Sequence, residues 1–338
     1  MRTHLFEEWS DFYYGEPTQT YGTSTSQINI TTSGNVSVSN AIFEKLSKVK
    51  YGGAIYCWQV PILFLSEKCS YINLTSTNYG GAIFLYNIQE SILSKVCGYG
   101  CVSSNSHCQF DYISVTNDAT KRNRFSDVSV CHSISNNNNG FVIHCARGKI
   151  NLNSVNSSQN ECDRDAGIAC DLQSGENCCI VEYCSITNCT AKSYYCFFLY
   201  SSYQKQVRSC NILYNKQLGT DTSIGLIHSA AVVTIENSCI LGNEAICQVS
   251  GSSGSTISNC TIDFNSSVVY RVSITNIPKE SLIVKISCFS TALCESSYDS
   301  FGELTVLPDA LNQSKNKKRL WDGNLIFELI ILISFINS

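Results

Sequence analysis

A repeated glycine pair followed by apolar residues is the feature that most constrains the fold. The segment YGGAIYC at Tyr51–Cys57 returns as YGGAIFLYN at Tyr79–Asn87, so the second copy begins 28 residues after the first (79 against 51). A repeat of this length is typical of solenoids, in which each copy is one structural unit stacked on the next. The glycines permit a tight bend, and the Ala-Ile pair is expected to enter a short strand and pack inward.

Two weaker patterns carry the same period along much of the chain. Ile-x-Cys occurs at Ile55/Cys57, Ile143/Cys145 and Ile168/Cys170, and Ile-x-x-Asn occurs at Ile134/Asn137, Ile212/Asn215, Ile240/Asn243 and Ile262/Asn265. Intervals of roughly 20 to 30 residues match one turn of a parallel β-helix, which needs three short strands and their corners. We therefore predict an all-β fold, a single right-handed parallel β-helix (solenoid) of about 9–11 turns with short capping segments at both ends.

Composition shifts along the chain suggest its subdivision. We expect an N-terminal cap or irregular segment at 1–25, the parallel β-helix at 26–295, a polar irregular segment at 296–324 and a short apolar tail at 325–338. A parallel stack exposes strand edges at its ends, which must be covered. The aromatic residues Trp9, Phe12, Tyr13 and Tyr14 are expected to cover the open end of the solenoid.

Composition also limits the partners. Charged residues make up 15% of the chain and the formal net charge is −4, so nothing indicates a nucleic-acid partner. The 20 cysteines have two explanations: disulfides formed in an oxidising compartment, or a ladder of buried thiols that act as small apolar side chains. We favour mostly reduced, stacked thiols, with Cys184, Cys210, Cys239, Cys260 and Cys288 at equivalent places in successive turns. No Cys-x-x-Cys pair occurs, and no cofactor is expected.

The two ends of the chain bear on localisation. Met1–Thr25 contains Glu7, Glu8 and Asp11 and lacks the apolar core of a secretory signal. The apolar run Leu325–Ile336 contains Glu328 and is shorter than the roughly 20 residues that a spanning helix needs. Membrane association through this run is one expectation. The alternatives are a packed C-terminal cap, a truncated anchor and a lipid-anchor signal.

Two clusters are candidates for chemistry. The acidic spot around Asp163, Arg164 and Asp165 is the candidate catalytic group, because glycoside cleavage uses paired carboxylates. The alternative is a solvated corner before the strand at Ile168. Candidate metal ligands are Cys131, His132, His144 and Cys145, which zinc would accept. Two inward cysteines beside two outward histidines explain this second set as well.

The repeat has a family resemblance. GGAI followed by F-x-x-N, here Gly52–Ile55, Gly80–Ile83 and Phe84–Asn87, resembles the repeat of the polymorphic outer-membrane-protein family and of similar β-helix surface proteins in trichomonad parasites. The chain departs from that pattern after Ile83, where GGAI is absent and I-x-x-N replaces F-x-x-N. The resemblance implies a right-handed β-helix displayed at a cell surface, with adhesion as its role, and it transfers no catalytic residue.

These observations give one leading expectation about function and two alternatives. The leading expectation is a non-enzymatic interaction or adhesion protein at the cell surface or outside the cell, with a glycan or protein ligand. One alternative is a carbohydrate-active enzyme, a polysaccharide lyase or hydrolase. The other is a degenerate or partial family member with no independent function. Three or more Asp, Glu, Arg or Lys side chains converging within about 10 Å on the outer face would favour the enzyme. The oligomeric state is not specified by the sequence.

Overall fold

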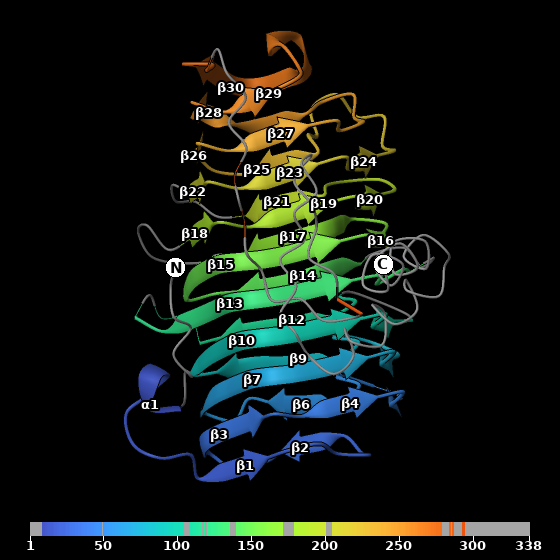
Figure 1. The fold of residues 1–338 in the computed structure, drawn as a ribbon, viewed down its shortest axis with the longest axis vertical. Helices are drawn as coiled ribbons and strands as arrows, with labels where there is room; N and C mark the ends of the chain where they lie inside the picture. Colours follow the sequence, from blue (N-terminus) through green and yellow to red (C-terminus); the bar gives the residue numbers. More distant parts are fainter. Residues whose placement is uncertain are drawn as a thin grey trace, which may run out of the picture.

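The protein is a parallel β-solenoid (Figure 1). The computed structural model describes residues 9–278 apart from 49, 105–107, 117, 119, 136–139, 172–178 and 201–204, together with residues 284, 286, 293 and 294. Within them, one 24-stranded sheet and two three-stranded sheets wind around a continuous core. All the strand pairings are parallel, as the repeat predicted.

Strands stack in four columns around the axis. The first column contains β2 (Ile28–Ile30), β6 (Ile55–Trp58), β9 (Ile83–Ile88), β12 (Asp111–Val115), β14 (Phe141–Ala146), β17 (Asp165–Asp171), β21 (Phe197–Tyr200), β25 (Ile227–Ser229), and the start of both β28 (Val249–Ser258) and β30 (Val269–Thr275). The second contains β1 (Gln19–Tyr21), β3 (Gly34–Ser39), β7 (Ile62–Ile72), β10 (Glu90–Tyr99), β13 (Arg122–Cys131), β15 (Lys149–Ser158), β18 (Cys179–Glu182), β22 (Lys205–Arg208) and β26 (Val233–Glu236). Residues that pair between neighbouring strands of a column lie one turn apart along the solenoid.

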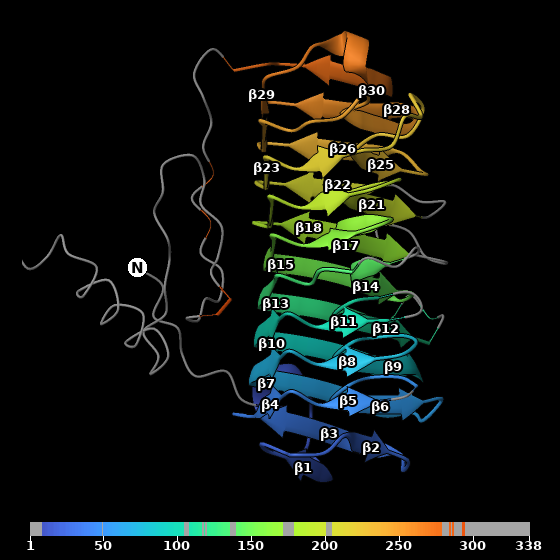
Figure 2. The same cartoon turned by 90° about the vertical axis from the view of Figure 1, so that its right-hand side faces the viewer.

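The other two columns close each turn. The long strands β7, β10, β13 and β15 continue past a corner into the third column, which also contains β4 (Ile42–Glu44), β19 (Ser185–Thr187), β23 (Asn211–Leu213), β27 (Cys239–Leu241) and β29 (Thr261–Ile262). The fourth contains β5 (Ser47–Lys48), β8 (Thr75–Ser76), β11 (Val102–Ser103), β16 (Glu161–Cys162), β20 (Thr190–Ala191) and β24 (Lys216–Gln217). Figure 2 shows the columns from the side.

The solenoid has about seven turns, fewer than the 9–11 expected from the period of the sequence. The described strands begin at Gln19 and end at Thr275, and the expected apolar tail at 325–338 lies outside the described residues.

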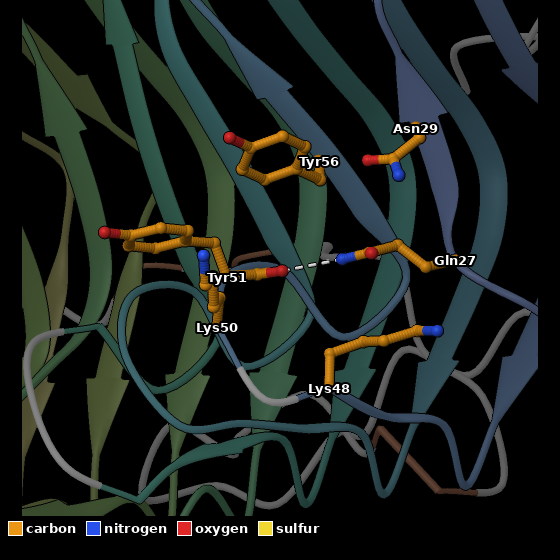
Figure 3. Close-up of a pocket in the computed structure, with 6 residues that line it drawn as sticks. All are labelled: Gln27, Asn29, Lys48, Lys50, Tyr51 and Tyr56. Carbon is orange, nitrogen blue, oxygen red and sulfur yellow. Dashed lines mark hydrogen bonds between the residues drawn. The ribbon is translucent and has the colours of Figure 1, made fainter.

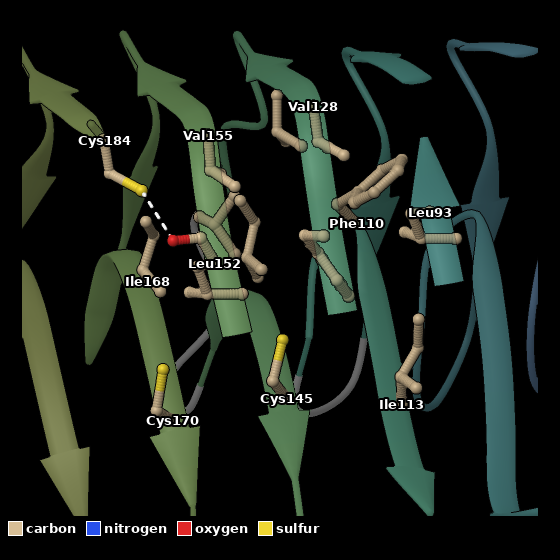
Figure 4. Close-up of a cluster of buried hydrophobic side chains, with 14 of the residues drawn as sticks. Leu93, Phe110, Ile113, Val128, Cys145, Leu152, Val155, Ile168, Cys170 and Cys184 are labelled. Carbon is tan, nitrogen blue, oxygen red and sulfur yellow. Dashed lines mark hydrogen bonds between the residues drawn. The ribbon is translucent and has the colours of Figure 1, made fainter. Parts of the chain in front are cut away.

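The predicted isoleucine stack is confirmed. Ile55 pairs with Ile83 and Ile143 pairs with Ile168, all in the first column and all fully buried. Figure 4 shows Ile168 within the buried core, beside Cys170 of the same strand. The glycine pairs have the expected role, since Gly52 and Gly80 adopt positive φ angles of 56° and 65°. A Cβ atom on Gly53 would overlap the carbonyl oxygen of Gly81 in the next turn, so only glycine fits between these turns.

Left-handed residues also make the corners on either side of the third column. One corner contains Asn40, Lys68, Lys95, Asp127, Ser154, Tyr183, Ser209, Asn237 and Asn259, and the other contains Lys45, Asn73, Gly100, His132, Gln159, Asn188, Tyr214 and Gly242. Most of these residues are not glycine. Because each stands at the same place in its turn, one positive-φ residue per corner bends the chain between flat strands.

The helices are short. Helix α1 (Trp9–Phe12) precedes the first strand, and a 3-10 helix, η1 (Ser266–Val268), precedes β30. The expectation that the N-terminal aromatic residues cover the open end is wrong. Trp9, Phe12 and Tyr13 pack instead on the outward side chains of Leu65 and Ile92, on the flank of the second column. These two apolar side chains point away from the core, so they need a cover of their own. Tyr14 is fully exposed.

The cysteines are mainly buried thiols, as predicted. Sixteen cysteines among the described residues are buried and free, and one disulfide joins Cys97 to Cys294. Six thiols have a common geometry: each donates to the carbonyl two residues earlier and to a carbonyl of the preceding turn, at Sγ···O distances of 3.1–3.6 Å, and they are Cys69, Cys101, Cys184, Cys189, Cys210 and Cys260. Burial raises the pKa of Cys189 to about 11, so this thiol stays protonated and unreactive.

One proposed member of the cysteine ladder is displaced. Ser238 occupies the level between Cys210 and Cys260, and its hydroxyl accepts from the Cys210 amide at 3.1 Å. Cys239 is one residue further along and pairs with Asn211 in β23, so it lies on the outward side. A shift of one residue reverses the direction of a strand side chain, which spacing alone did not reveal. Cys288 lies outside the described residues.

The Ile-x-x-Asn pattern marks an internal asparagine ladder. The buried Asn215 side chain donates to the Ile186 carbonyl at 2.8 Å and accepts from the Cys189 amide at 3.0 Å. Asn243 repeats the arrangement one turn later, donating to Ile212 and accepting from Asn215. These amides therefore satisfy backbone groups at a corner where strand pairing is interrupted.

Replacing Asn215 with leucine is expected to destabilise the protein by about 2–4 kcal/mol, because the buried Ile186 carbonyl and Cys189 amide lose their partner. Urea denaturation would measure the loss. The matched control is Asn151→Leu, at a half-buried outward position of β15 whose side chain makes no hydrogen bond within the described part. Equal midpoints for the two variants would contradict the role of the ladder.

Candidate functional site

Aromatic side chains form a stripe on the outside of the first column. Because alternate residues of a strand point to opposite faces, the residue after each inward position of the first column points outward. At successive levels these outward residues are Tyr56, Phe84, Tyr112 and His144, then Ala169, and then Phe198 and His228. Ala169 divides the stripe into a block near the N-terminal end of the solenoid and a second block further along.

The rings in the first block touch one another. Ring centroids are 5.7 Å apart for Tyr56 and Phe84, 5.5 Å for Phe84 and Tyr112, and 5.0 Å for Tyr112 and His144. These separations follow from the spacing of paired strands, which holds each ring against the next. The stripe widens through the outward pair Trp58 and Tyr86 and through Tyr51 and Tyr79 at the preceding corner.

The stripe is partly exposed. Trp58 has 43% of its surface exposed and Tyr200, in the second block, has 50%, whereas Phe84 is covered by its neighbours and has 2%. Burial raises the pKa of the Tyr112 hydroxyl, and burial together with Asp165 raises the pKa of Tyr195 to about 12. These hydroxyls are therefore protonated at neutral pH. The stripe thus presents apolar ring faces and edges with neutral hydrogen-bonding groups.

The second block is smaller. His228 stacks on Tyr195 at a centroid separation of 4.6 Å and on Phe198 at 5.8 Å. Its Nδ1 lies 2.6 Å from the Ser250 hydroxyl, and burial lowers the pKa of the imidazole. The ring is therefore mainly neutral at pH 7, so this block contributes shape and hydrogen bonding and little charge.

A hollow lies at the N-terminal end of the stripe (Figure 3). Its volume is about 440 Å³, and it is lined by Gln27, Asn29, Lys48, Lys50, Tyr51 and Tyr56. The Gln27 amide closes one wall, since Nε2 donates to the Tyr51 carbonyl at 2.6 Å and to the Gly52 carbonyl. Tyr51 and Tyr56 belong to both the hollow and the stripe, so the two form one continuous surface.

The hollow is cationic. Lys48 is half-buried and Lys50 is exposed. Within the described residues the ion pairs involve other cations, and neither of these lysines has an acidic partner. Figure 3 shows Lys48 below Gln27 and Lys50 beside Tyr51. The sequence spacing did not suggest that these lysines lie beside Tyr51 and Tyr56, because the lysines come from the fourth column and the tyrosines from the first column and the corner before it.

One carboxylate lies in the outward positions of the first column in the described part of the chain. Asp171 ends β17, between Ala146 and Tyr200 in the register. Burial raises its pKa, and the nearby charge of Arg147 lowers it by a smaller amount. Asp171 is therefore a single, partly buried acid beside the gap in the stripe.

The structure separates the predicted catalytic residues. Asp163 is half-buried and accepts a hydrogen bond from the Ser193 hydroxyl at 2.7 Å. The Arg164 guanidinium lies over the Tyr194 ring, 4.6 Å from its centroid. Asp165 is 1% exposed and neither carboxylate oxygen has a hydrogen-bond partner. The two acids therefore do not share an accessible face, because a bend at Asp163 and Arg164 interrupts the extended strand that the sequence suggested.

The predicted metal ligands also lie apart. His144 is outward on β14 and stacks on Phe141 at 4.7 Å, while Cys145 is inward and pairs with Cys170. Cys131 lies at the end of β13, on the third column beside Cys97, and His132 makes the next corner. His144 and Cys145 therefore lie on the first column, whereas Cys131 and His132 lie at the end of the third. No group of three His, Cys, Asp or Glu residues suited to a metal ion occurs among the residues described.

Comparison with known proteins finds no matching family model, no matching curated protein and no matching solved structure. The resemblance to the GGAI/F-x-x-N surface proteins therefore stays a prediction. None of the helices in the described ranges is both long and apolar enough to cross a membrane. Leu325–Ile336 lies outside those ranges.

The sequence contains a periodic signal for the stripe. Tyr56, Phe84 and Tyr112 follow one another at intervals of 28 residues (84 − 56 and 112 − 84). Each comes one residue after an inward position of the first column. An outward aromatic residue at the period of the turn predicts a stacked external row, provided that the inward register has been assigned.

Proposed function

We propose that the protein is a non-enzymatic interaction protein that binds a glycan chain along the aromatic stripe. The observation that carries this proposal is the row of mutually packed rings on one flank, of which Trp58 is the most exposed in the first block. Sugar rings have an apolar C–H face and a rim of hydroxyl groups. An aromatic surface with neutral Tyr hydroxyls complements both, and the ring contacts fix the ring orientations before a ligand arrives.

Binding without catalysis is favoured over the enzyme alternative. Glycoside hydrolysis uses two carboxyl groups about 5–9.5 Å apart on either side of the scissile bond. Within the described part of the first column, Asp171 is the one outward acid, and its outward neighbours in the register are Ala146 and Tyr200. The criterion of three or more converging charged side chains is met neither here nor at Asp163, where Arg164 turns to Tyr194.

An extracellular or surface location fits the cysteine chemistry. The Cys97–Cys294 disulfide supports an oxidising compartment, and the thiols without a disulfide are buried away from oxidants. The resemblance to GGAI/F-x-x-N surface proteins supports the same location, and we propose adhesion as the biological role. The alternative of a degenerate family member is less favoured, because a decayed surface is not expected to keep an ordered external row of rings.

Replacing Trp58 with alanine is expected to weaken glycan binding about fivefold, since one stacked ring contributes about 1 kcal/mol. The probe is a hexasaccharide of alternating glucuronic acid and N-acetylglucosamine, with titration calorimetry as the measurement. Trp58→Phe should retain most of the affinity. Tyr14→Ala, which removes a fully exposed ring remote from the stripe, is the control. If the unaltered protein does not bind the hexasaccharide or its carboxyl-reduced form, the proposed function fails.

A further inference from the structure

We propose that the hollow at the N-terminal end of the stripe is a subsite for an acidic sugar, with Lys48 and Lys50 holding the carboxylate of a uronic acid. This inference rests on the proposed function, because the hollow opens onto the stripe through Tyr51 and Tyr56. It adds that the glycan is acidic, and it places the binding of its carboxylate at the N-terminal end of the stripe.

The shape of the hollow suits one unit of a chain. Its volume of about 440 Å³ lies in the range of about 300–1,000 Å³ that is usual for small-molecule sites. The Tyr51 and Tyr56 ring centroids are 6.0 Å apart with an interplanar angle of 22°, so two nearly parallel rings form its aromatic side. A sugar seated there remains continuous with another placed over Trp58, which is 43% exposed and whose ring centroid lies 6.0 Å from that of Tyr51.

The charge of the hollow selects the anion. The ammonium groups of Lys48 and Lys50 line the hollow, and neither forms an ion pair with a described acidic residue. An unpaired cation pair favours a negatively charged ligand and disfavours a cationic one. Cations elsewhere along the stripe are differently placed: Arg147 acts on Asp171, and Arg164 lies over Tyr194.

The polar wall provides the remaining contacts. The Asn29 side chain, exposed on β2, makes no hydrogen bond among the described residues and is free to meet a hydroxyl group. The Gln27 amide nitrogen is already committed to the Tyr51 and Gly52 carbonyls, which fixes its Oε1 as an acceptor facing away from them. The hollow therefore combines two cations, two amides and two rings.

The experiment compares two ligands and three proteins. The ligands are the glucuronate-containing hexasaccharide and the same compound with its carboxylates reduced to alcohols. The proteins are the unaltered chain, the double variant Lys48→Gln/Lys50→Gln and the control Lys45→Gln, which removes an exposed lysine already paired with Glu44. They are made in a host that adds no N-linked glycans, because Asn29 begins an Asn-Ile-Thr sequence.

The unaltered protein should prefer the charged hexasaccharide roughly tenfold, and the double variant should bind both ligands with the weaker affinity. Added salt should reduce the preference, since the lysines are accessible to solvent. The variant Lys48→Arg/Lys50→Arg should restore it. Lys45→Gln should leave both affinities unchanged.

Different outcomes overturn different claims. If Trp58→Ala weakens both ligands but the double lysine variant keeps the preference for the charged one, the acidic subsite is wrong and the glycan-binding stripe stands. If neither ligand binds and Trp58→Ala instead dissociates a dimer in analytical ultracentrifugation, the stripe is an interface between copies of the chain and both proposals fall.

Discussion

Replacing Ile212 with aspartate is expected to destabilise the protein by more than about 4 kcal/mol, because it places an unpaired charge in a dry core. Ile212 is fully buried in β23, between Ile186 and Ile240 of the adjacent turns. The described strands of the third column provide no cation for an ionised carboxylate there, and removal of the isoleucine also leaves a cavity. Urea denaturation followed by circular dichroism would measure the loss.

The damage is expected to be local at first. In a solenoid each turn contacts mainly its neighbours, so a defect in β23 should open β19 and β27 before it reaches β7 and β10. Amide hydrogen exchange resolves this order. The control Leu218→Asp introduces the same charge close by at a position 60% exposed, and should change stability by less than about 0.5 kcal/mol. An unchanged melting curve for Ile212→Asp would refute the inward column.

The fold could be predicted because successive turns repeat the same sequence pattern. The glycine pair before Ile55 and Ile83 marks the same corner twice, and the period then places Ile143 and Ile168 in the same column. Stacking makes a single column sufficient to define the architecture. The number of turns is less well predicted, since the structure has about seven where 9–11 are expected.

The candidate site was much less predictable. The hollow unites Gln27 and Asn29 with Lys48 and Lys50, whose proximity depends on how the fourth column folds back on the first. That return path varies in length from turn to turn and has no signature in spacing. The inward positions also contain a residue that the pattern does not predict. Asp111 pairs with Ile83 and is fully buried where the pattern predicts an aliphatic residue.

Buried acids should make the protein less stable as the pH rises. Asp165 is 1% exposed, its two oxygens have no hydrogen-bond partner, and burial raises its pKa well above the usual range. Asp111 is also fully buried with a raised pKa, although one of its oxygens accepts from the His144 amide at 2.8 Å. In the folded protein burial therefore favours the neutral form of both acids.

The direction of the pH effect follows from proton linkage. Above a pH of about 4 the unfolded chain loses these protons while the folded chain keeps them. Unfolding then releases protons, so the free energy of unfolding falls by up to about 1.4 kcal/mol per pH unit for each acid, until the pH reaches the raised pKa of the folded state. Below pH 4 both states are protonated and the stabilising contribution is fully present.

Asp165→Asn is therefore expected to stabilise the protein at pH 7 by at least about 1 kcal/mol and to have little effect at pH 4, because the amide has nearly the shape of the neutral acid and cannot ionise. The double variant Asp111→Asn/Asp165→Asn should have a flatter stability profile between pH 4 and 8. Urea midpoints across that range test both statements.

Asp118 supplies the contrast that makes the result interpretable. It is exposed, and hydrogen bonds from the Thr120 amide and hydroxyl lower its pKa, which is the opposite direction. Asp118→Asn should consequently gain no stability at pH 7. If Asp165→Asn behaves like Asp118→Asn, or if its urea midpoints run parallel to those of the unaltered protein from pH 4 to 8, then the Asp165 carboxylate is ionised and solvated. In that case the start of β17, where Asp165 is now buried, would be accessible to water.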